Sequence, residues 1–285
     1  MTASGKIAYQ GEAGAYSHLA CLEAYPDFEP LACPSFDDAF AAVSNQTAAL
    51  GMIPIENTLG GRVADIHHLL PESDLHIVAE HYQPVHHCLL GVPGSTIEGL
   101  ERVESHVQAL AQCREYLRGR GLRPIAVADT AGAARELAER GDRSCGALAS
   151  RLAGEIYGLD FLEENVEDRE GNTTRFVIMS LTPSLPELEA GPAMTSIVFR
   201  VRSVPAALYK ALGGFATNGV NITKLESYIM DASFSVAQFY VEFEGHPDSV
   251  GVRHALDELA FFSEHYRILG TYPAKPYRRL VNRGG

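Results

Sequence analysis

The sequence predicts an α/β protein in two parts, a larger region with a largely parallel sheet and a smaller C-terminal unit. Short apolar runs alternate with stretches of helical period in the larger region, which is typical of α/β domains. The residue composition then changes at a proline-containing segment, which is followed by a unit of about eighty residues with the order β-α-β-β-α-β. The length of 285 residues suits about two domains.

In the larger region, strands are expected where apolar runs are bounded by turn residues, and helices where apolar residues recur at the helical period. The strands are predicted at residues 6–9, 50–55, 88–92, 102–106 and 125–128, and helices at residues 16–25, 108–118 and 131–140. A further helix is predicted to begin at Ser35, which can accept an N–H bond, while Asp37 and Asp38 favour the positive helix end.

The C-terminal unit follows a linker at residues 183–193, which contains Pro183, Pro186 and Pro192. Its strands are predicted at residues 197–202, 220–229, 237–243 and 266–269, and its helices at residues 205–217 and 252–262. Pro205 suits the first turn of a helix, and Asn218-Gly219 suits a helix end. This order of elements predicts a ferredoxin-like unit.

The charge and hydropathy of the chain exclude several classes of partner. The chain carries 23 Lys and Arg against 36 Asp and Glu, a formal net charge of -13, which argues against nucleic-acid and anionic-membrane partners. No apolar run approaches the roughly 18 residues of a membrane-spanning helix, and the first residues lead into a strand without a signal-peptide core. We therefore expect a cytoplasmic protein.

The cysteines and histidines argue against a metal site. The cysteines at residues 21, 33, 88, 113 and 145 include no Cys-x-x-Cys pair, and without a secretion signal we expect reduced, mostly buried thiols. Zinc is the alternative, because histidines occur in the pairs His67-His68 and His86-His87. Adjacent residues point in different directions and rarely bind one ion together. We expect no metal, and the sequence lacks the glycine-rich phosphate loops of nucleotide sites.

Two polar segments stand at strand ends. Glu56, Asn57 and Thr58 follow an apolar strand at the position where open α/β sheets bind ligands, and helix capping by Asn57 or Thr58 is an equally weighted alternative. Residues 172–176 place Arg175 at a strand start, where its guanidinium suits a carboxylate and a neighbouring hydroxyl can donate. A surface arginine beside strand formers is the alternative that propensity alone favours.

A third segment, Ser105-His106, invites a comparison with Ser–His hydrolases. Adjacent positions do not by themselves bring the serine oxygen and the imidazole into productive contact, and no Gly-x-Ser-x-Gly turn surrounds Ser105. We therefore reject covalent hydrolysis at this serine.

Together these segments resemble the prephenate dehydratase family over about residues 5–275. The matching segments, in chain order, are residues 11–17, 54–57 with 60–61, 105–106 with Gln112, Thr130, 157–159, Asn172 and 174–176. In the C-terminal unit, residues 206–209 and 221–227 resemble the ACT regulatory domain of the family. The chain departs from the family pattern at Ala206, where Gly is usual, at Tyr228-Ile229, where Arg-Pro is usual, and at Ala15 and Ala131, where hydroxyl residues are common.

The resemblance implies a two-lobed catalytic domain like the type II periplasmic binding proteins at residues 5–182, with lobes of about 5–80 plus 165–182 and 81–164. It also implies an ACT domain at residues 194–275. The implied activity is that of a monofunctional carbon–oxygen lyase without cofactor, which converts prephenate to phenylpyruvate by loss of CO2 and hydroxide. L-Phenylalanine is the implied effector, and a homodimer or homotetramer is the implied assembly.

The resemblance also implies roles for particular residues. The implied catalytic residues are Thr174, Glu56, Asn57, Ser105 and Gln112, with Thr174 and Glu56 as competing candidates for assisting the leaving hydroxyl. The implied substrate-binding residues are Arg175, Phe176, Thr58, Ser17 and Thr130, and Arg175 either holds a carboxylate or orders its loop. The implied regulatory residues are Ala206, Ala207, Leu208, Asn218, Glu226 and Ser227. An arogenate dehydratase and a non-catalytic amino-acid sensor are the alternatives.

Overall fold

The computed structural model describes residues 5–63, 66–202, 204–229 and 237–278. The first residues of the chain, on which the expected absence of a signal peptide partly depends, lie outside these ranges. Contacts between Cα atoms divide the chain into two compact units, Met1–Val63 with His81–Phe176 and Ala64–Glu80 with Val177–Gly285. The domain and lobe boundaries expected from the sequence stay a prediction.

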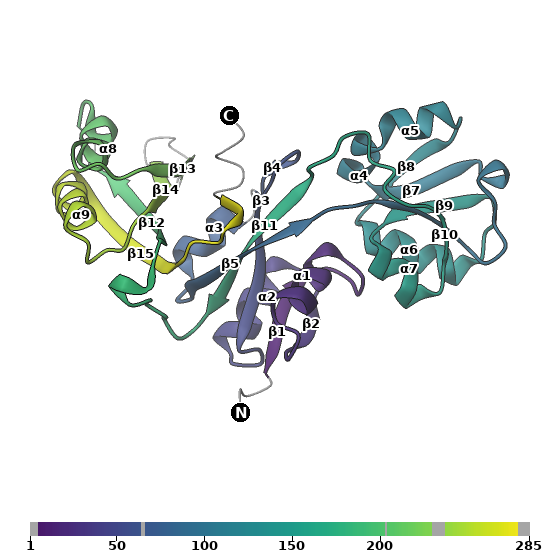
Figure 1. Cartoon of the computed structure of the whole chain (residues 1–285), viewed down its shortest axis with the longest axis horizontal. Coiled ribbons are helices and arrows are strands. Elements are labelled where there is room, and N and C mark those ends of the chain that lie inside the picture. The colour runs from purple at the N-terminus through teal and green to yellow at the C-terminus, as the bar shows by residue number, and fades with distance from the viewer. Residues whose placement is uncertain (1–4, 64–65, 203, 230–236, 279–285) are drawn as a thin grey trace. The chain divides into compact units, whose positions relative to one another are not determined.

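The first sheet has the strand order β2-β1-β3-β11-β5, with β4 paired to β3 (Figure 1). Strand β1 is parallel to both β2 and β3. The strands are β1 (Lys6–Gln10), β2 (Glu29–Cys33), β3 (Leu50–Asn57), β4 (Gly61–Arg62), β5 (His76–Pro84) and β11 (Thr173–Ser180), and the helices between them are α1 (Tyr16–Ala24), α2 (Phe36–Ser44) and α3 (Ile66–Glu72). The expected strands and helices of this region are confirmed, while β2, β4, β5 and α3 were not predicted.

Local sequence explains where α2 begins. The Ser35 side chain accepts a hydrogen bond from the Asp38 N–H at 3.1 Å, as the sequence predicts. Phe40 and Val43 then face the core, and Met52 and Ile53 bury β3 beside them. The carboxyl ends of β1 and β3 consequently lie at the same edge of the sheet.

The second sheet has the order β10-β6-β9-β7-β8, with β7 parallel to β8 and β9, and β6 antiparallel to β9 and β10. Its strands are β6 (Cys88–Gly91), β7 (Arg102–His106), β8 (Arg123–Val127), β9 (Cys145–Ala149) and β10 (Asp160–Glu163). Its helices are α4 (Val107–Gln112), α5 (Arg114–Gly119), α6 (Thr130–Arg140) and α7 (Arg151–Tyr157), with a short 3₁₀ turn, η1 (Ile97–Gly99).

Helices cover both faces of this second sheet (Figure 1). Leu90 and Ala147 pack with α6 and α7, whereas their neighbours Leu89 and Leu148 pack with α4 and α5. Successive residues of a strand point to opposite faces, so each strand contributes to two cores.

The single helix expected at residues 108–118 is wrong, because two helices meet at Cys113. The Asp168 carboxylate accepts the N–H groups of Glu115 at 2.8 Å and Tyr116 at 3.0 Å, which stabilises a second helix start at this point. A residue that lies far along the chain therefore breaks the helical pattern.

The C-terminal sheet has the order β13-β14-β12-β15, and its neighbouring strands are antiparallel. The elements are β12 (Ala193–Val201), α8 (Ala207–Thr217), β13 (Ile222–Ile229), β14 (Ala237–Glu244), α9 (Val250–Phe262) and β15 (Ser263–Pro273), preceded by a 3₁₀ turn in the linker, η2 (Leu188–Ala190). The predicted β-α-β-β-α-β unit is confirmed. Its core packs Phe199, Phe215 and Phe243 between the sheet and the two helices.

Residues 64–80 belong to this same unit. The Arg267 guanidinium donates to the carbonyl groups of Leu70, Pro71 and Ser73, at 2.8, 3.2 and 2.7 Å, and so binds the C-terminal end of α3. A Cβ atom on Gly270 would lie 1.9 Å from the Ile77 carbonyl oxygen, so only glycine allows β15 to approach the start of β5 this closely.

All five cysteines are buried and free, as expected. Within the described ranges, His, Cys, Asp and Glu side chains form no group of three or more that could hold a metal ion. The helices of the same ranges include none with the length and apolarity to cross a membrane.

Ala206, one of the departures from the expected family pattern, has an unfavourable backbone conformation. It precedes α8 with φ 60° and ψ 21°, in the left-handed region that side chains with a Cβ disfavour and glycine adopts freely. The helix therefore begins at Ala207 rather than at Pro205, and Ala206 pays a conformational cost at a position where the family resemblance leads us to expect glycine.

We expect Ala206→Gly to stabilise the chain by about 0.5–1 kcal/mol, because relief of the left-handed strain outweighs the greater unfolded-state entropy of glycine. Ala207→Gly, one residue later inside the helix, should instead destabilise by about 1 kcal/mol. Calorimetric unfolding midpoints of the two variants check both signs. A lower midpoint for Ala206→Gly would contradict this account.

Candidate active site

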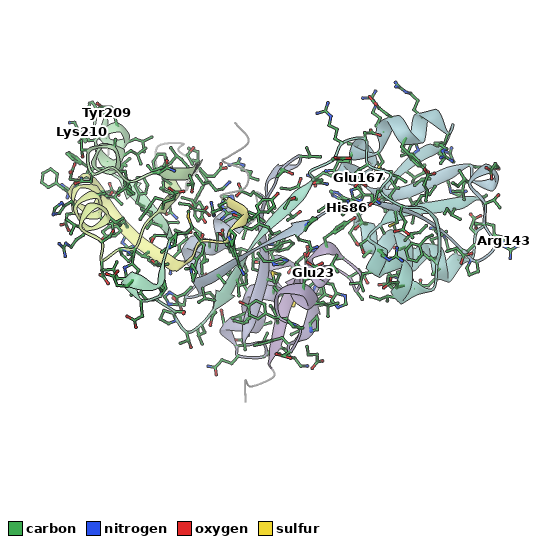
Figure 2. All side chains as sticks on the ribbon, viewed as in Figure 1. Glu23, His86, Arg143, Glu167, Tyr209 and Lys210 are labelled. Carbon is green, nitrogen blue, oxygen red and sulfur yellow. The ribbon has the colours of Figure 1, made fainter. Side chains whose placement is uncertain are left out.

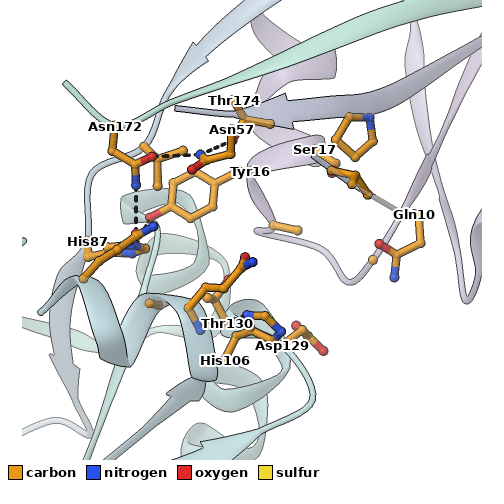
Figure 3. A pocket seen from close by; sticks show the side chains of 18 of the residues that line it. Gln10, Tyr16, Ser17, Asn57, His87, His106, Asp129, Thr130, Asn172 and Thr174 are labelled. Atoms are coloured by element: carbon orange, nitrogen blue, oxygen red, sulfur yellow. Dashed lines mark hydrogen bonds between the residues drawn. The ribbon is translucent and has the colours of Figure 1, made fainter. Parts of the chain in front are cut away.

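A cavity of about 240 Å³ lies within the first unit, at the carboxyl ends of β1 and β3 (Figure 3). This edge is where open α/β sheets usually bind ligands. The residues that line it come from β1, β3 and the end of β7, the starts of α1, α6 and β11, helix α4, and the segments after β4 and between β5 and β6. They are Gln10, Gly11, Ala15, Tyr16, Ser17, Pro54, Asn57, Val63, Val85, His87, His106, Gln108, Ala109, Gln112, Asp129, Thr130, Asn172, Thr174 and Phe176.

Asn57 organises one wall of the cavity. Its Oδ1 accepts the N–H groups of Leu59 at 3.0 Å and Gly60 at 2.6 Å, in the turn that follows β3. Its Nδ2 donates to Asn172 Oδ1 at 2.8 Å and to Thr174 Oγ1 at 2.9 Å (Figure 3). The carboxamide thus uses both of its ends on the protein and joins β3 to β11.

The hydrogen bonds continue from Asn57 to further residues of the lining. Asn172 Nδ2 donates to Gln112 Oε1 at 2.8 Å, and the same oxygen lies 2.9 Å from His87 Nε2. His87 Nδ1 lies 2.9 Å from the Tyr16 hydroxyl, which also donates to the His86 carbonyl at 2.5 Å. A continuous chain of polar contacts therefore runs from Thr174 to Tyr16.

Two helix starts also face the cavity. Helix α1 begins after Ala15 without a side-chain cap, so N–H groups of its first turn remain for water or a ligand. At α6 the Asp129 carboxylate caps the helix by accepting the Gly132 N–H at 2.6 Å.

The cavity offers neutral donors rather than cations. Its described lining contains no Lys or Arg, and Asp129 is its one carboxylate. Burial lowers the pKa of His87 from its ordinary value, so this imidazole is neutral near pH 7. Burial also raises the pKa of Tyr16 well above its ordinary value, which keeps the phenol protonated.

Six of the ten residues implied as catalytic or substrate-binding line this cavity, and four do not. Those that line it are Thr174, Asn57, Gln112, Phe176, Ser17 and Thr130. Glu56, Thr58, Ser105 and Arg175 are not in its lining. Their roles in substrate binding or catalysis stay predictions, and their contacts show what else they do.

The four residues outside the lining make contacts within the protein. Arg175, with 3% of its side chain exposed, donates from Nε to Glu56 Oε1 at 2.6 Å, whereas Glu56 is 36% exposed. The Ser105 hydroxyl is buried and donates to the Leu148 carbonyl at 2.6 Å. Thr58 Oγ1 donates to the Gly171 carbonyl and accepts the Thr173 N–H.

Sequence reasoning did not assign roles to several residues of the lining, above all Tyr16 and His87. Both were visible, Tyr16 inside the glycine motif and His87 inside a histidine pair that we considered only for metal binding. Their signal is spatial, because Tyr16 opens α1 while His87 lies 71 residues away between two strands.

The implied regulatory residues lie in the C-terminal unit. Ala206, Ala207 and Leu208 form the start of α8, and Asn218 ends it by donating to the Gly214 carbonyl at 2.8 Å. Glu226 and Ser227 lie on β13, where Glu226 pairs with Lys224 at 3.3 Å.

Comparison with known proteins decides the family. A family model described as prephenate dehydratase matches residues 7–184. The chain belongs to the prephenate dehydratase family. It is 52% identical over 275 residues to the bifunctional N-acyl-homoserine lactone acylase/prephenate dehydratase of Komagataeibacter europaeus, covering 96% of this chain and 97% of that protein.

The chain is also similar to a plant relative and to a bacterial relative of known structure. It is 40% identical to arogenate dehydratase/prephenate dehydratase 1 of Arabidopsis thaliana, a chloroplastic protein, over 94% of this chain and 72% of that one. The crystal structure of the Arthrobacter aurescens prephenate dehydratase in complex with L-Phe matches with a TM-score of 0.87 and 25% identity, over 98% of this chain and 97% of that one. The expected family, the two-lobed fold and the carbon–oxygen lyase class are thereby confirmed.

A substitution of Glu56 distinguishes two roles for this carboxylate, the structural ion pair with Arg175 and the predicted role as catalytic acid. Glu56→Gln removes the negative charge beside the buried Arg175 guanidinium, so we expect the free energy of unfolding to fall by about 1–2 kcal/mol, less than for a fully buried pair because Glu56 is partly exposed. At temperatures below the unfolding midpoint of this variant, its turnover should stay within about threefold of the wild-type value.

Glu29→Gln is the matched control, because its exposed pair with Lys6 should contribute almost nothing to stability. A large loss of turnover in Glu56→Gln at an unchanged unfolding midpoint would instead support Glu56 as the acid.

Proposed function

We propose that this chain converts prephenate to phenylpyruvate, with Thr174 donating a hydrogen bond to the departing hydroxyl group. In this reaction the bond to the ring carboxylate breaks and releases CO2, and its electron pair enters the ring. The ring C–O bond breaks at the opposite carbon, and the hydroxide that leaves takes up a proton to become water. Aromaticity of the product supplies the driving force, so the enzyme has to position a dianion and assist the leaving group.

The observation that carries the proposal is the direction of the Asn57–Thr174 hydrogen bond. Backbone N–H groups can only donate, so Leu59 and Gly60 require the oxygen of the Asn57 carboxamide to face them. Asn57 Nδ2 therefore donates to Thr174 Oγ1. Since Thr174 accepts this bond, its own hydroxyl hydrogen is available to a ligand in the cavity.

Neutral donors suit this substrate. A cation against the ring carboxylate would stabilise the group that has to leave as CO2, whereas a neutral donor near the hydroxyl favours charge that develops in the transition state. Threonine is a weak acid, so Thr174 acts through hydrogen bonding or by relaying a proton from water. Phe176 contributes apolar wall beside it.

We expect Thr174→Val to lower kcat by about 100-fold or more, because one donor to the developing negative charge is lost while side-chain shape is kept. Thr174→Ser retains the hydroxyl and should keep most of the activity. Phenylpyruvate formation, followed by its absorbance in alkali, measures both. Full turnover by Thr174→Val would remove this hydroxyl from the mechanism.

We further propose prephenate, rather than arogenate, as the preferred substrate. The two differ in whether the side chain bears a keto or an amino group. The family model supports prephenate, and the Arabidopsis relative, whose name includes both activities, keeps arogenate as the alternative. The purified chain should show the higher kcat/KM on prephenate. Absence of turnover on both compounds, in protein that binds L-phenylalanine, would favour the amino-acid sensor.

We propose, in addition, that L-phenylalanine regulates a cytoplasmic homo-oligomer through the C-terminal unit. The complex of the Arthrobacter relative with L-Phe supports this effector. Chain connectivity supports a route by which an effector bound to the C-terminal unit influences the cavity. The chain passes between the two units after Val63, before His81 and after Phe176. Val63 and Phe176 themselves line the cavity, and Val85 lies four residues beyond the second crossing.

Turnover of prephenate is accordingly expected to fall as L-phenylalanine is added, with D-phenylalanine as the matched control. Effector binding has to favour one global state to act in this way. Calorimetric titration together with initial rates separates binding from inhibition, and a failure of L-phenylalanine to bind would refute the proposed effector.

A further inference from the structure

The donor and acceptor directions of the hydrogen bonds can also be followed from Asn57 toward His87. With Asn57 Nδ2 facing Asn172, the oxygen of the Asn172 carboxamide accepts and its nitrogen donates to Gln112 Oε1. Gln112 Oε1 therefore faces both Asn172 and His87, and its contact with His87 Nε2 at 2.9 Å requires a hydrogen on that nitrogen.

This requirement fixes the tautomer of His87. A neutral imidazole carries one hydrogen, so with Nε2 protonated its Nδ1 is an acceptor. The Tyr16 hydroxyl at 2.9 Å is the donor that faces Nδ1, and its hydrogen is shared with the His86 carbonyl. Tyr16 can serve as this donor because burial keeps its phenol protonated.

The backbone of the same segment is also held in place. The His87 N–H donates to Glu167 Oε2 at 3.0 Å, and the His86 ring lies 2.7 Å from Glu167 Oε1 (Figure 2). The Val166 N–H donates to the His87 carbonyl at 3.0 Å. The imidazole is thus attached to a segment that has little freedom to move away from Gln112.

We propose that His87 is a positioning residue: its contacts with Gln112 and Tyr16 select the Nε2–H form, and in this form it orients the Gln112 carboxamide. With its oxygen bound to His87 and Asn172, Gln112 presents its nitrogen, with two N–H donors, to a ligand in the cavity. Without the His87 donor, the Asn172 bond alone holds the Gln112 oxygen. The carboxamide is then less firmly oriented and presents its oxygen, which repels an anion, for part of the time. The proposal rests on prephenate, a dianion, as the substrate.

The kinetic test compares two substitutions of His87. His87→Leu removes the donor and should lower kcat/KM on prephenate by about 10- to 100-fold. His87→Gln retains an N–H near the position of Nε2 and should recover most of that loss, which a purely structural role would not allow. Equal impairment of both variants at equal unfolding midpoints would overturn the proposal, as would wild-type kinetics in His87→Leu.

Nitrogen-15 NMR of the imidazole supplies a readout that is independent of activity and of the His87 variants. The wild-type chain should show His87 in the Nε2–H form near neutral pH. Tyr16→Phe, which removes one of the two contacts that select this form, should show a smaller share of it. An Nδ1–H form in the wild type would overturn the proposal even if His87→Leu fails to fold. Absence of prephenate turnover in a wild-type chain with the Nε2–H form would refute only the proposed function.

Discussion

The arrangement of the cavity depends on one constraint, namely that backbone N–H groups can donate hydrogen bonds and never accept them. Leu59 and Gly60 impose this constraint on Asn57, and every carboxamide, hydroxyl and imidazole linked to Asn57 inherits a direction from it. Amide and imidazole side chains could otherwise bind in two orientations. A tight turn after β3 therefore sets the donor and acceptor direction of the amide side chains along the lining of the cavity.

The same constraint explains how a cavity without Lys or Arg in its described lining can bind an anion. Donors whose direction is already fixed lose little entropy when the ligand binds, and they do not have to reorganise as charge develops. The arginine closest in sequence to Thr174 is Arg175, and it is buried against Glu56. Charge in this region of the protein stabilises the β3–β11 framework, and neutral dipoles face the ligand.

Much of the fold could be predicted because local sequence and packing agree. Ser35 caps α2 through a neighbouring residue, and the alternation of Phe199 and Val201 with polar residues is visible in the sequence itself. Strand β9, Cys145–Ala149, was missed because its small residues lack the β-branched signature and are specified by burial on both faces. The break between α4 and α5 was missed because Asp168, far along the chain, creates it.

The candidate site was predictable to the extent that motifs mark it. Motif order identified Asn57, Gln112 and Thr174, all of which line the cavity. Motif order does not say to which side of a strand each residue points. Asn57 and Thr174 line the cavity, whereas the residues next to them, Glu56 and Arg175, point to the other side of their strands and pair with each other. His87 was beyond prediction for a different reason, because the tautomer of its imidazole depends on partners from two other segments, Tyr16 and Gln112.

The contacts of α3 and the start of β5 with β15 have a consequence for the evolution of such chains. The proline-containing linker resembles a boundary at which a regulatory module could be lost or exchanged by recombination. A cut there would separate Arg267 and the sheet around Gly270 from α3 and the start of β5. Exchange of the sequence after the linker alone would therefore leave α3 and the start of β5 without the residues that they contact.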